Sequence, residues 1–580
     1  MMALMSSISA LTPLRSTAVL VLLLAARAGA QLPVLSVQQV GGGIVLSWPA
    51  SASGFMLQTT EDPSVPASWA NVAGTYLPQG ANLNWTNTFP AGKRFFRLAQ
   101  NGPLPVPTNA LTGSIASMGT PWVVTTDANA PGSPVVPGTA VGTVPKIITT
   151  ANDDGSLDVA WISTASPPRI VITHIVPDNT SYKAAWHLRP PTLAYLGGFA
   201  RDAAGAMFYL TTVAEDLTTQ PQPKLLHRPN IAHLVKLSPL GAEIFRTDLR
   251  TNFEWAGAEP LYSPMTWGTS QLAVGDGRVV MTMSCNTEFD PPVNSRHQWH
   301  ISLGADAGTG ALNLYKPAFG HCWDHRLIFH AGKFINTSLG DAGLRGIGVA
   351  DVVNSWHKVA FAIKGGDSTT VPFYQNVFTR LGDLAPGQAG YGLLFTTEKT
   401  NTYSGGTSPV ISARNVAFAH VRSDFAEAAT NSTNQYDVAI VDTNTGNPAA
   451  QAFDIPIKDY WGTTYAGKNK GLVWLTNYTN RSTENAERPH LVSLGDGRFI
   501  ALWERWTLTA YADTLGAVID EYGNVVKAPR SIGSTVRLHR QDSPVRFGTK
   551  AAWTVGESGP AKLVFYTLDA ELVLKRTVIQ

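Results

Sequence analysis

The chain has 580 residues, more than a single hydrophobic core supports and enough for two or three domains. Charged residues make up 14% of it and the formal net charge is +2, which excludes the strong field expected of a nucleic-acid-binding protein or of one held to an acidic membrane surface. With 52 Gly, 38 Pro and 16 Trp, the composition favours a turn-rich all-β protein.

Residues 1–30 have the pattern of a secretory signal peptide. Arg15 supplies the positive flank, residues 18–26 form an apolar core, and Ala28-Gly29-Ala30 is a small-residue cleavage site. The alternative, a membrane anchor, needs an apolar run of ~20 residues, and this one is too short. We therefore expect a soluble protein that is secreted or periplasmic after cleavage, with no integral membrane segment.

Residues 31–100 predict a small β-sandwich, with short strands at 34–37, 44–49, 54–60 and 93–98. This stretch resembles the fibronectin-III-like modules of exported proteins from Verrucomicrobia-type bacteria. The resemblance rests on four segments: Leu46-Ser47-Trp48-Pro49, Phe55-Met56-Leu57-Gln58, Trp69-Ala70-Asn71-Val72 and Arg94-Phe95-Phe96-Arg97-Leu98. It implies an accessory domain without catalytic residues.

Residues 101–144 are rich in Pro, Gly and Thr, which is typical of a linker. Residues 122–126 are the exception. Their apolar and β-branched side chains suggest a strand that closes the following domain.

A hairpin motif recurs in the remainder of the chain. The apolar run 490–494 leads into Gly495-Asp496-Gly497, and the alternating run 498–504 leaves it. Residues 271–281 nearly copy this motif, and residues 325–335 form a looser version. Asp-Gly between such runs is a strong hairpin signal, because both turn positions favour φ > 0.

Residues 145–580 divide into seven units of about four strands and about 60 residues each, which predicts a seven-bladed β-propeller. In the fifth unit we expect a strand at 376–381 and a last strand at 437–441. Propellers with six or eight blades and an array of β-sandwiches are the alternatives. The chain resembles β-propellers of the WD40 and kelch type through its hairpins, without identifying a family.

In a propeller the first strand of every blade lines a central channel, so the residues that begin these strands should meet at one mouth. Here they are polar, which predicts a ligand site. The predicted ligand-binding residues are Gln271, Asp324, His325, Arg326, Gln375, Asn376, Arg488, His490, Gln541 and Asp542. The alternative is that polar residues at strand starts simply face solvent.

Three further features are ambiguous. On a strand, His321 and His325 share one face at a separation of ~13 Å, too far apart to bind one metal ion, and Asp324 points to the other face. Glu504 beside Trp506 suits glycosidic acid chemistry or an ordinary strand end. Cys285 and Cys322 form either a disulfide or two buried thiols.

These patterns leave two functions open. One is an exported binding module that docks a glycan or protein ligand at the channel mouth, with the sandwich as a spacer. The other is a carbohydrate hydrolase or lyase that uses His and carboxylate groups at the same mouth. The absence of metalloprotease, nucleophile-elbow and phosphate-loop motifs favours binding. We expect a monomer without a nucleic-acid partner, we assign no metal site, and the cofactor is unknown.

Overall fold

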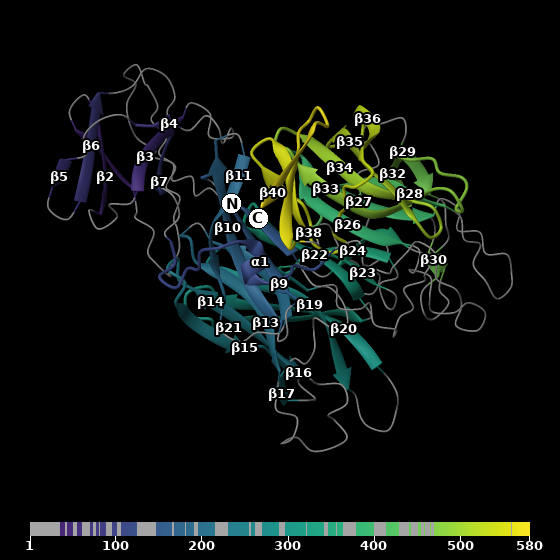
Figure 1. Cartoon of the computed structure of the whole chain (residues 1–580), viewed down its shortest axis with the longest axis horizontal. Helices are drawn as coiled ribbons and strands as arrows, with labels where there is room; N and C mark the ends of the chain where they lie inside the picture. The colour runs from purple at the N-terminus through teal and green to yellow at the C-terminus, as the bar shows by residue number, and fades with distance from the viewer. Residues whose placement is uncertain are drawn as a thin grey trace. The chain divides into compact units, whose positions relative to one another are not determined.

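A computed structural model of the chain separates into two compact units (Figure 1). The boundary lies between Pro105 and Val106, apart from residues 307–309, which group with the first unit. The structure describes residues 35–40, 43–49, 55–60, 70–72, 77–79, 82–88, 95–100, 106–123, 147–152, 154–164, 168–179, 181–190, 195–202, 204–214, 230–253, 257–260, 270–288, 296–320, 322–340, 346–354, 357–362, 379–398, 413–427, 440–441, 450–453, 457–458, 464–465, 469–557 and 560–579.

The first unit contains two antiparallel sheets that share one apolar core, as expected for a small β-sandwich. One sheet has the order β1 (Ser36–Val40), β2 (Gly43–Pro49), β6 (Asn82–Thr88) and β5 (Leu77–Gln79), and the other the order β4 (Ala70–Asn71), β3 (Phe55–Thr60) and β7 (Phe95–Gln100). Trp48 is fully buried, and the rings of Trp85 and Phe96 lie 5.7 Å apart between the sheets. The likeness to a fibronectin-III-like module remains a prediction.

Within the described residues, the second unit holds seven sheets of four or five strands, each built from one continuous stretch of chain. We number them in chain order. The first sheet consists of β8 (Ile147–Ala151), β9 (Leu157–Ser163), β10 (Arg169–Asp178) and β11 (Ser181–Leu188), and the second of β12 (Tyr195–Arg201), β13 (Met207–Ala214), β14 (Asn230–Leu237) and β15 (Glu243–Asp248). The third sheet consists of β18 (Ser270–Gly275), β19 (Arg278–Glu288), β20 (Arg296–Asp306) and β21 (Leu312–Gly320), and the fourth of β22 (Cys322–His330), β23 (Lys333–Gly340), β24 (Gly346–Asp351) and β25 (Lys358–Ala362).

The fifth sheet consists of β26 (Arg380–Pro386), β27 (Gly390–Glu398), β28 (Arg414–Arg422), β32 (Asn469–Trp474) and β29 (Ala450–Phe453). The sixth sheet consists of β33 (Asn485–Ser493), β34 (Arg498–Trp506), β35 (Tyr511–Asp520) and β36 (Val525–Gly533). The seventh sheet consists of β37 (Val545–Phe547), β38 (Lys550–Glu557), β39 (Lys562–Leu568) and β40 (Leu574–Ile579). Two hairpins accompany these sheets, β16 (Arg250–Phe253) with β17 (Gly257–Pro260), and β30 (Ile457–Lys458) with β31 (Thr464–Tyr465).

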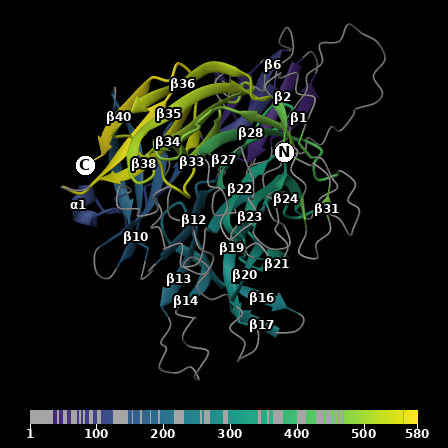
Figure 2. The same cartoon turned by 90° about the vertical axis from the view of Figure 1, so that its right-hand side faces the viewer.

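The first strands of the seven sheets contact one another in a closed circuit, in the order β8, β12, β18, β22, β26, β33, β37 and back to β8. In Figure 2, β12, β22 and β33 lie toward the middle, and β14, β36 and β40 lie at the outside. This arrangement is an all-β propeller, in which closure removes the long sheet edges that would otherwise be exposed. From the circuit we infer seven blades.

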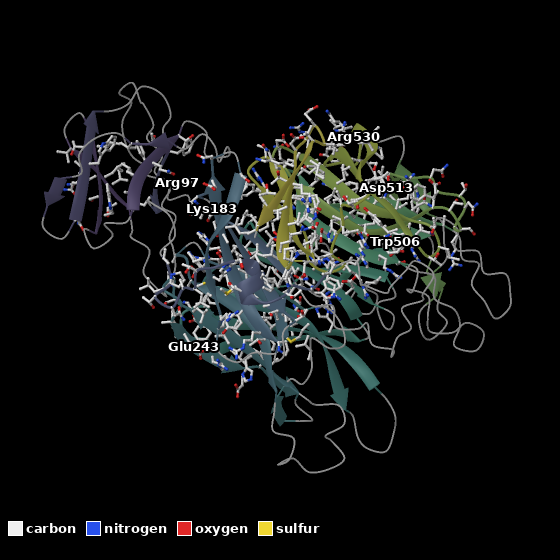
Figure 3. The ribbon with its side chains drawn as sticks, viewed as in Figure 1. Arg97, Lys183, Glu243, Trp506, Asp513 and Arg530 are labelled. Atoms are coloured by element: carbon white, nitrogen blue, oxygen red, sulfur yellow. The ribbon has the colours of Figure 1, made fainter. Side chains whose placement is uncertain are left out.

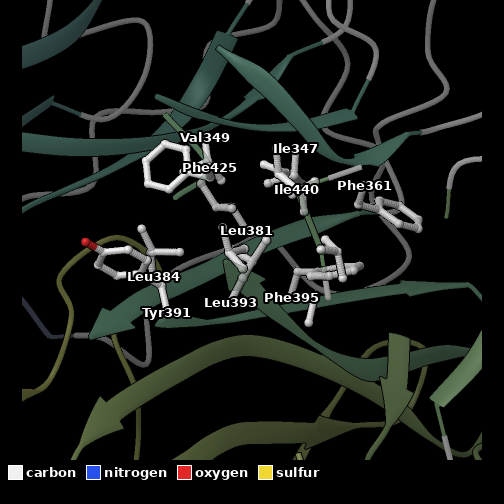
Figure 4. Packing of buried hydrophobic residues seen from close by; sticks show 14 of the residues in the cluster. Ile347, Val349, Phe361, Leu381, Leu384, Tyr391, Leu393, Phe395, Phe425 and Ile440 are labelled. Carbon is white, nitrogen blue, oxygen red and sulfur yellow. The ribbon is translucent and has the colours of Figure 1, made fainter. Parts of the chain in front are cut away.

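Apolar side chains fill the spaces between neighbouring sheets. Figure 4 shows one such core, where Ile347 and Phe361 of the fourth sheet face Leu381, Leu393 and Phe395 of the fifth. Because the middle strands are covered on both faces, β9, β24 and β28 are buried along nearly their whole length. This explains why most residues of these strands are apolar, whereas the edge strand β15 is mostly exposed.

The predicted hairpins are confirmed, but their turns differ. Asp276 and Gly277 have φ of 52° and 63°, as expected when both turn residues are left-handed. In the sixth-sheet hairpin the positive φ values belong to Gly495 (85°) and Gly497 (79°). The prediction of a left-handed Asp496 was therefore wrong, because the loop has three residues and is closed by a bond from the Leu494 N–H to the Arg498 carbonyl.

The fifth sheet departs from its predicted boundaries. Of the predicted strand at 376–381, residues 376–378 lie outside the described residues, and the inner strand β26 runs on beyond the predicted end to Pro386. Of the predicted last strand at 437–441, residues 437–439 lie outside the described residues, and Val441 forms an isolated bridge with Val421. The fourth strand of this sheet is β32 instead, which pairs with β28.

A segment inside the predicted linker, residues 106–123, packs within the second unit. Val123 pairs in parallel with Gly556 of the seventh sheet, and Leu111 pairs with His187 of the first. Between these pairings lies the short helix α1 (Ile115–Met118), whose two buried side chains join the core formed by the first and seventh sheets. No helix among the described residues is long and apolar enough to span a membrane.

Candidate functional site

Side chains from the inner strands converge on residues 538–543, which connect β36 to β37 and which we call the axial segment. Four consecutive main-chain carbonyls of this segment accept hydrogen bonds from these side chains. The donors are Arg488 to Leu538 O (2.9 Å), His490 to His539 O (2.6 Å), Arg326 to Arg540 O (3.1 Å) and Gln271 to Gln541 O (3.2 Å). Three sheets thus hold one short stretch of main chain.

Asp383, on the inner strand of the fifth sheet, lies at the centre of this arrangement. Its carboxylate accepts hydrogen bonds from Arg326 Nε at 3.1 Å and from His490 Nδ1 at 2.8 Å. The main-chain N–H of Leu491 and the hydroxyl of Ser543 also donate to it. Because the Asp383 side chain is only 5% exposed, these four donors replace the water that a carboxylate would otherwise bind.

Irregular backbone places Asp383 and Arg488 in these positions. The pairing of β26 with β27 shifts register between Leu381 and Leu384, and that of β33 with β34 shifts between Glu487 and His490. Such bulges bend a strand and redirect the side chains within it. Inside the second bulge Arg488 has φ of 50°, a conformation that non-glycine residues rarely adopt.

Electrostatics keep the Asp383 carboxyl ionised. Burial raises its pKa, but the charge and hydrogen bond of His490 and the charge of Arg326 outweigh burial and bring the pKa below the ordinary value. Both ring nitrogens of His490 face acceptors, Asp383 on one side and the His539 carbonyl on the other. Both ring nitrogens thus lie against groups of the protein itself, and neither is directed at a substrate.

Arg326 completes the network. Besides Asp383 it donates to Asp324 at 2.6 Å and to the Leu381 carbonyl at 3.1 Å. Burial lowers the pKa of Arg326, whereas the charges of Asp324 and Asp383 raise it, and the net shift is upward. The group is therefore a permanent cation that joins the fourth and fifth sheets to the axial segment.

A second buried ion cluster surrounds Glu504, which is fully buried on β34. Its carboxylate accepts from Arg537 Nε at 3.0 Å, from the Leu538 N–H at 2.8 Å and from the Trp506 indole at 2.8 Å. The Arg537 guanidinium also lies 4.3 Å from the ring centre of Tyr511. Figure 3 labels Trp506, which is 6% exposed. Glu504 beside Trp506 is thus an internal anchor of the segment and not an open carboxylate beside a sugar platform.

The predicted site residues fall into three groups. Seven of them lie beside the axial segment or within it: Gln271, Asp324, Arg326, Arg488, His490, Gln541 and Asp542. Asp542 accepts a hydrogen bond from the Ile147 N–H at 2.8 Å. His325 lies elsewhere, because its ring lies between the third and fourth sheets and packs at a tilt against that of His300. Gln375 and Asn376 lie outside the described residues.

Sequence reasoning missed Asp383 because it sought the polar residues of the fifth inner strand at Gln375 and Asn376, whereas Asp383 lies in the interior of β26. A signal was present in Gly382, which directly precedes it. A Cβ atom at Gly382 would lie 2.3 Å from the Leu394 carbonyl oxygen and 3.0 Å from that of Pro489, so only glycine fits there. A Gly-Asp pair at the start of an inner strand marks a bulge that turns a carboxylate toward the axis.

Among the side chains that the structure describes, no group of three His, Cys, Asp or Glu residues is arranged to hold a metal ion. Cys285 lies on β19 and Cys322 begins β22, and their side chains are outside those described. The disulfide and the two buried thiols therefore both remain predictions for this pair.

No family model matches the chain, and no curated protein matches its sequence. Among solved structures it is similar to a sialidase from Trypanosoma rangeli, with 10% identity over 65% of this chain and 54% of the sialidase, and a TM-score of 0.32. It is similar to prolyl oligopeptidase B from Galerina marginata, with 7% identity over 73% of this chain and 47% of that one, and a TM-score of 0.33.

A third similar structure is a GH43 β-xylosidase/α-arabinofuranosidase from a compost microbial metagenome, with 12% identity over 66% of this chain and 90% of that one, and a TM-score of 0.24. The chain thus spans about half the length of the first two proteins. All three TM-scores are below 0.5, so these similarities decide neither the fold nor the chemistry, and the propeller fold rests on the chain's own sheets and their circuit.

Proposed function

We propose that the chain is an exported, non-catalytic propeller that binds a protein or glycan ligand at the mouth of its central channel. The observation that supports binding over catalysis is the saturation of Asp383 and His490. Asp383 accepts four hydrogen bonds, and both ring nitrogens of His490 lie within hydrogen-bond distance of oxygens of the protein itself. A hydrolase or lyase would need an acid or base at this mouth with a proton or lone pair to exchange with substrate.

The surface for the ligand would be the outer side of the axial segment and its surroundings. Gln271, Arg540 and Asp542 are partly exposed, and the Asp324 side chain is 14% exposed. These groups offer amide, guanidinium and carboxylate functions beside a rigid main chain. Rigid polar groups of both charges suit the polar part of a protein interface or the hydroxyls of a glycan.

Binding is tested with the purified full chain on a glycan array and a peptide library, followed by affinity measurement for each hit. Arg540→Ala should weaken binding about tenfold or more, since truncating a central interface arginine typically costs at least about 1.4 kcal/mol. Arg576→Ala is the matched control, because Arg576 is a half-exposed arginine on the edge strand β40. Equal loss in both variants, or loss in neither, would place the ligand elsewhere.

The enzymatic alternative is tested with a panel of chromogenic glycosides and polysaccharides. We expect no turnover above that of the heat-denatured chain. Turnover that His490→Gln abolishes while the circular dichroism spectrum stays unchanged would overturn the proposal, because the imidazole would then be acting on a substrate.

A further inference from the structure

We propose that three histidines buried between the third and fourth sheets form an acid-sensitive latch, which loosens the contact between these sheets when the pH falls. This proposal is independent of the ligand at the channel mouth. We call the three residues, His300, His325 and His357, the histidine seam.

The seam joins two sheets through its rings. His300 lies on β20 of the third sheet, whereas His325 on β22 and His357 just before β25 belong to the fourth. The ring centres of His300 and His325 are 4.1 Å apart, and those of His300 and His357 are 5.1 Å apart. His300 and His325 are fully buried and His357 is 4% exposed, so water does not solvate these rings.

The hydrogen bonds of the seam suit neutral rings. His357 Nε2 contacts Asn336 Oδ1 at 2.8 Å, and the Asn336 amide donates in turn to the Arg326 carbonyl at 2.9 Å. Neither ring nitrogen of His300 has a hydrogen-bond partner among the described residues. A proton added to His300 would therefore place a charge in an apolar site without a compensating acceptor.

The charged groups around the seam add to this penalty. Lys316 on β21 and Asp351 on β24 are the nearby ionised groups from the flanking strands. Burial lowers the pKa of His300 well below its usual value, and His325 and His357 lower it further. Burial lowers the pKa of His357 to about 3, and Lys316 acts in the same direction. All described influences on these two rings therefore oppose protonation while the seam is closed.

The direction of the pH response follows from linkage. A histidine released to water titrates near about 6.5, above its value in the closed seam. The open form therefore takes up protons first as the pH falls, and the closed form is progressively disfavoured below about pH 6.5. Above that pH the contribution of the seam to stability is complete.

Two other buried histidines provide the contrast. His174 lies 2.9 Å from the carboxylate of Asp158, and His490 lies 2.8 Å from that of Asp383. Each of these rings faces a carboxylate, whereas neither ring nitrogen of His300 has a hydrogen-bond partner among the described residues. A proton added to His300 would have no such carboxylate beside it, so we expect acid to act at the seam between the third and fourth sheets.

Hydrogen exchange with mass spectrometry on the full chain tests the latch at about pH 7.5 and about pH 5, after correction for the intrinsic pH dependence of exchange. We expect peptides from β20 and β22 to lose protection by about tenfold or more at the lower pH, while a peptide from β34 keeps its protection. Equal protection of all three strands at both pH values would overturn the proposal.

Variants separate the latch from general acid sensitivity. His300→Leu removes a titrating ring and should abolish most of the acid response of β20 and β22. Lys316→Met should also reduce the response, because it brings the pKa of His357 closer to its value in water. Lys333→Met, which removes a partly exposed cation at the turn between β22 and β23, is the matched control for Lys316→Met and should leave the response unchanged.

If His300→Leu does not fold, Lys316→Met alone decides the question, since this side chain is only partly buried. An undiminished acid response in a folded Lys316→Met or His300→Leu variant would refute the role of the seam.

Discussion

Replacing Asp383 by asparagine keeps the size of the side chain and removes its charge. The wild-type carboxylate lies 3.1 Å from Arg326 Nε and 2.8 Å from His490 Nδ1. At such distances each attraction is roughly 5 kcal/mol for an effective dielectric constant of ~20, although desolvation cancels much of it. Removing one partner of a buried ion pair typically costs about 3–5 kcal/mol, because the remaining charges stay buried. The amide NH2 group of the asparagine would also point hydrogen-bond donors at groups that now donate to the Asp383 carboxylate, such as Arg326 Nε.

We therefore expect Asp383→Asn to lower the free energy of unfolding by about 3–5 kcal/mol at about pH 7, a large part of the ~5–15 kcal/mol that a domain usually has. Urea unfolding followed by tryptophan fluorescence measures this loss, with the transition of the second unit fitted separately. The matched control is Asp496→Asn, which breaks an exposed pair with Arg498 at a hairpin tip and should cost less than about 1 kcal/mol.

The same variant has a pH signature. Because the pKa of Asp383 is held below its ordinary value, its contribution to stability is complete above about pH 3.9 and is lost as the pH falls further. The difference between wild type and Asp383→Asn should thus stay constant from about pH 7 to about pH 5 and shrink toward pH 3. A loss below about 1 kcal/mol, or a difference that grows on acidification, would refute the electrostatic account of this network.

Two further substitutions test the backbone. Gly382→Ala should lower the free energy of unfolding by about 1–3 kcal/mol, because its Cβ would lie 2.3 Å from the Leu394 carbonyl oxygen, and wild-type stability in urea would argue against the bulge. Gly556→Val should displace the segment around Val123, since a Cβ there would lie 2.1 Å from the Trp122 carbonyl oxygen. We expect faster cleavage within residues 106–123 in limited proteolysis, and an unchanged rate would contradict the pairing of Val123 with Gly556.

Much of the fold was predictable because the propeller repeats local signals. Each hairpin needs turn residues that the chain marks with glycine, as at Asp276-Gly277, and each middle strand needs a mostly apolar segment. These signals do not depend on distant contacts, so they can be recognised one unit at a time. The fifth sheet was predicted less well, because its fourth strand, β32, follows a long stretch after β28 that contains other short strands.

The candidate site was predictable only in outline. Convergence at the channel axis follows from topology, and it brings Arg326, Arg488 and His490 to one segment. The face on which a side chain lies depends on the register of a bulged strand, and a shift of one residue sends it to the opposite face. For this reason His325 lies between two sheets, while its neighbour Arg326 reaches the axis. No single motif in the sequence indicates that the chain's own main chain lies at the axis.

The closure of the ring has a consequence for how the molecule is made. The bond from the Ile147 N–H to Asp542 joins residues separated by 395 positions, and Val123 pairs with Gly556. Contacts of such long range form late and slowly. Until the last sheet has been synthesised, the first sheet has no partner on that side, and its exposed surface favours aggregation. The first sheet therefore keeps one uncovered side until the seventh sheet has formed.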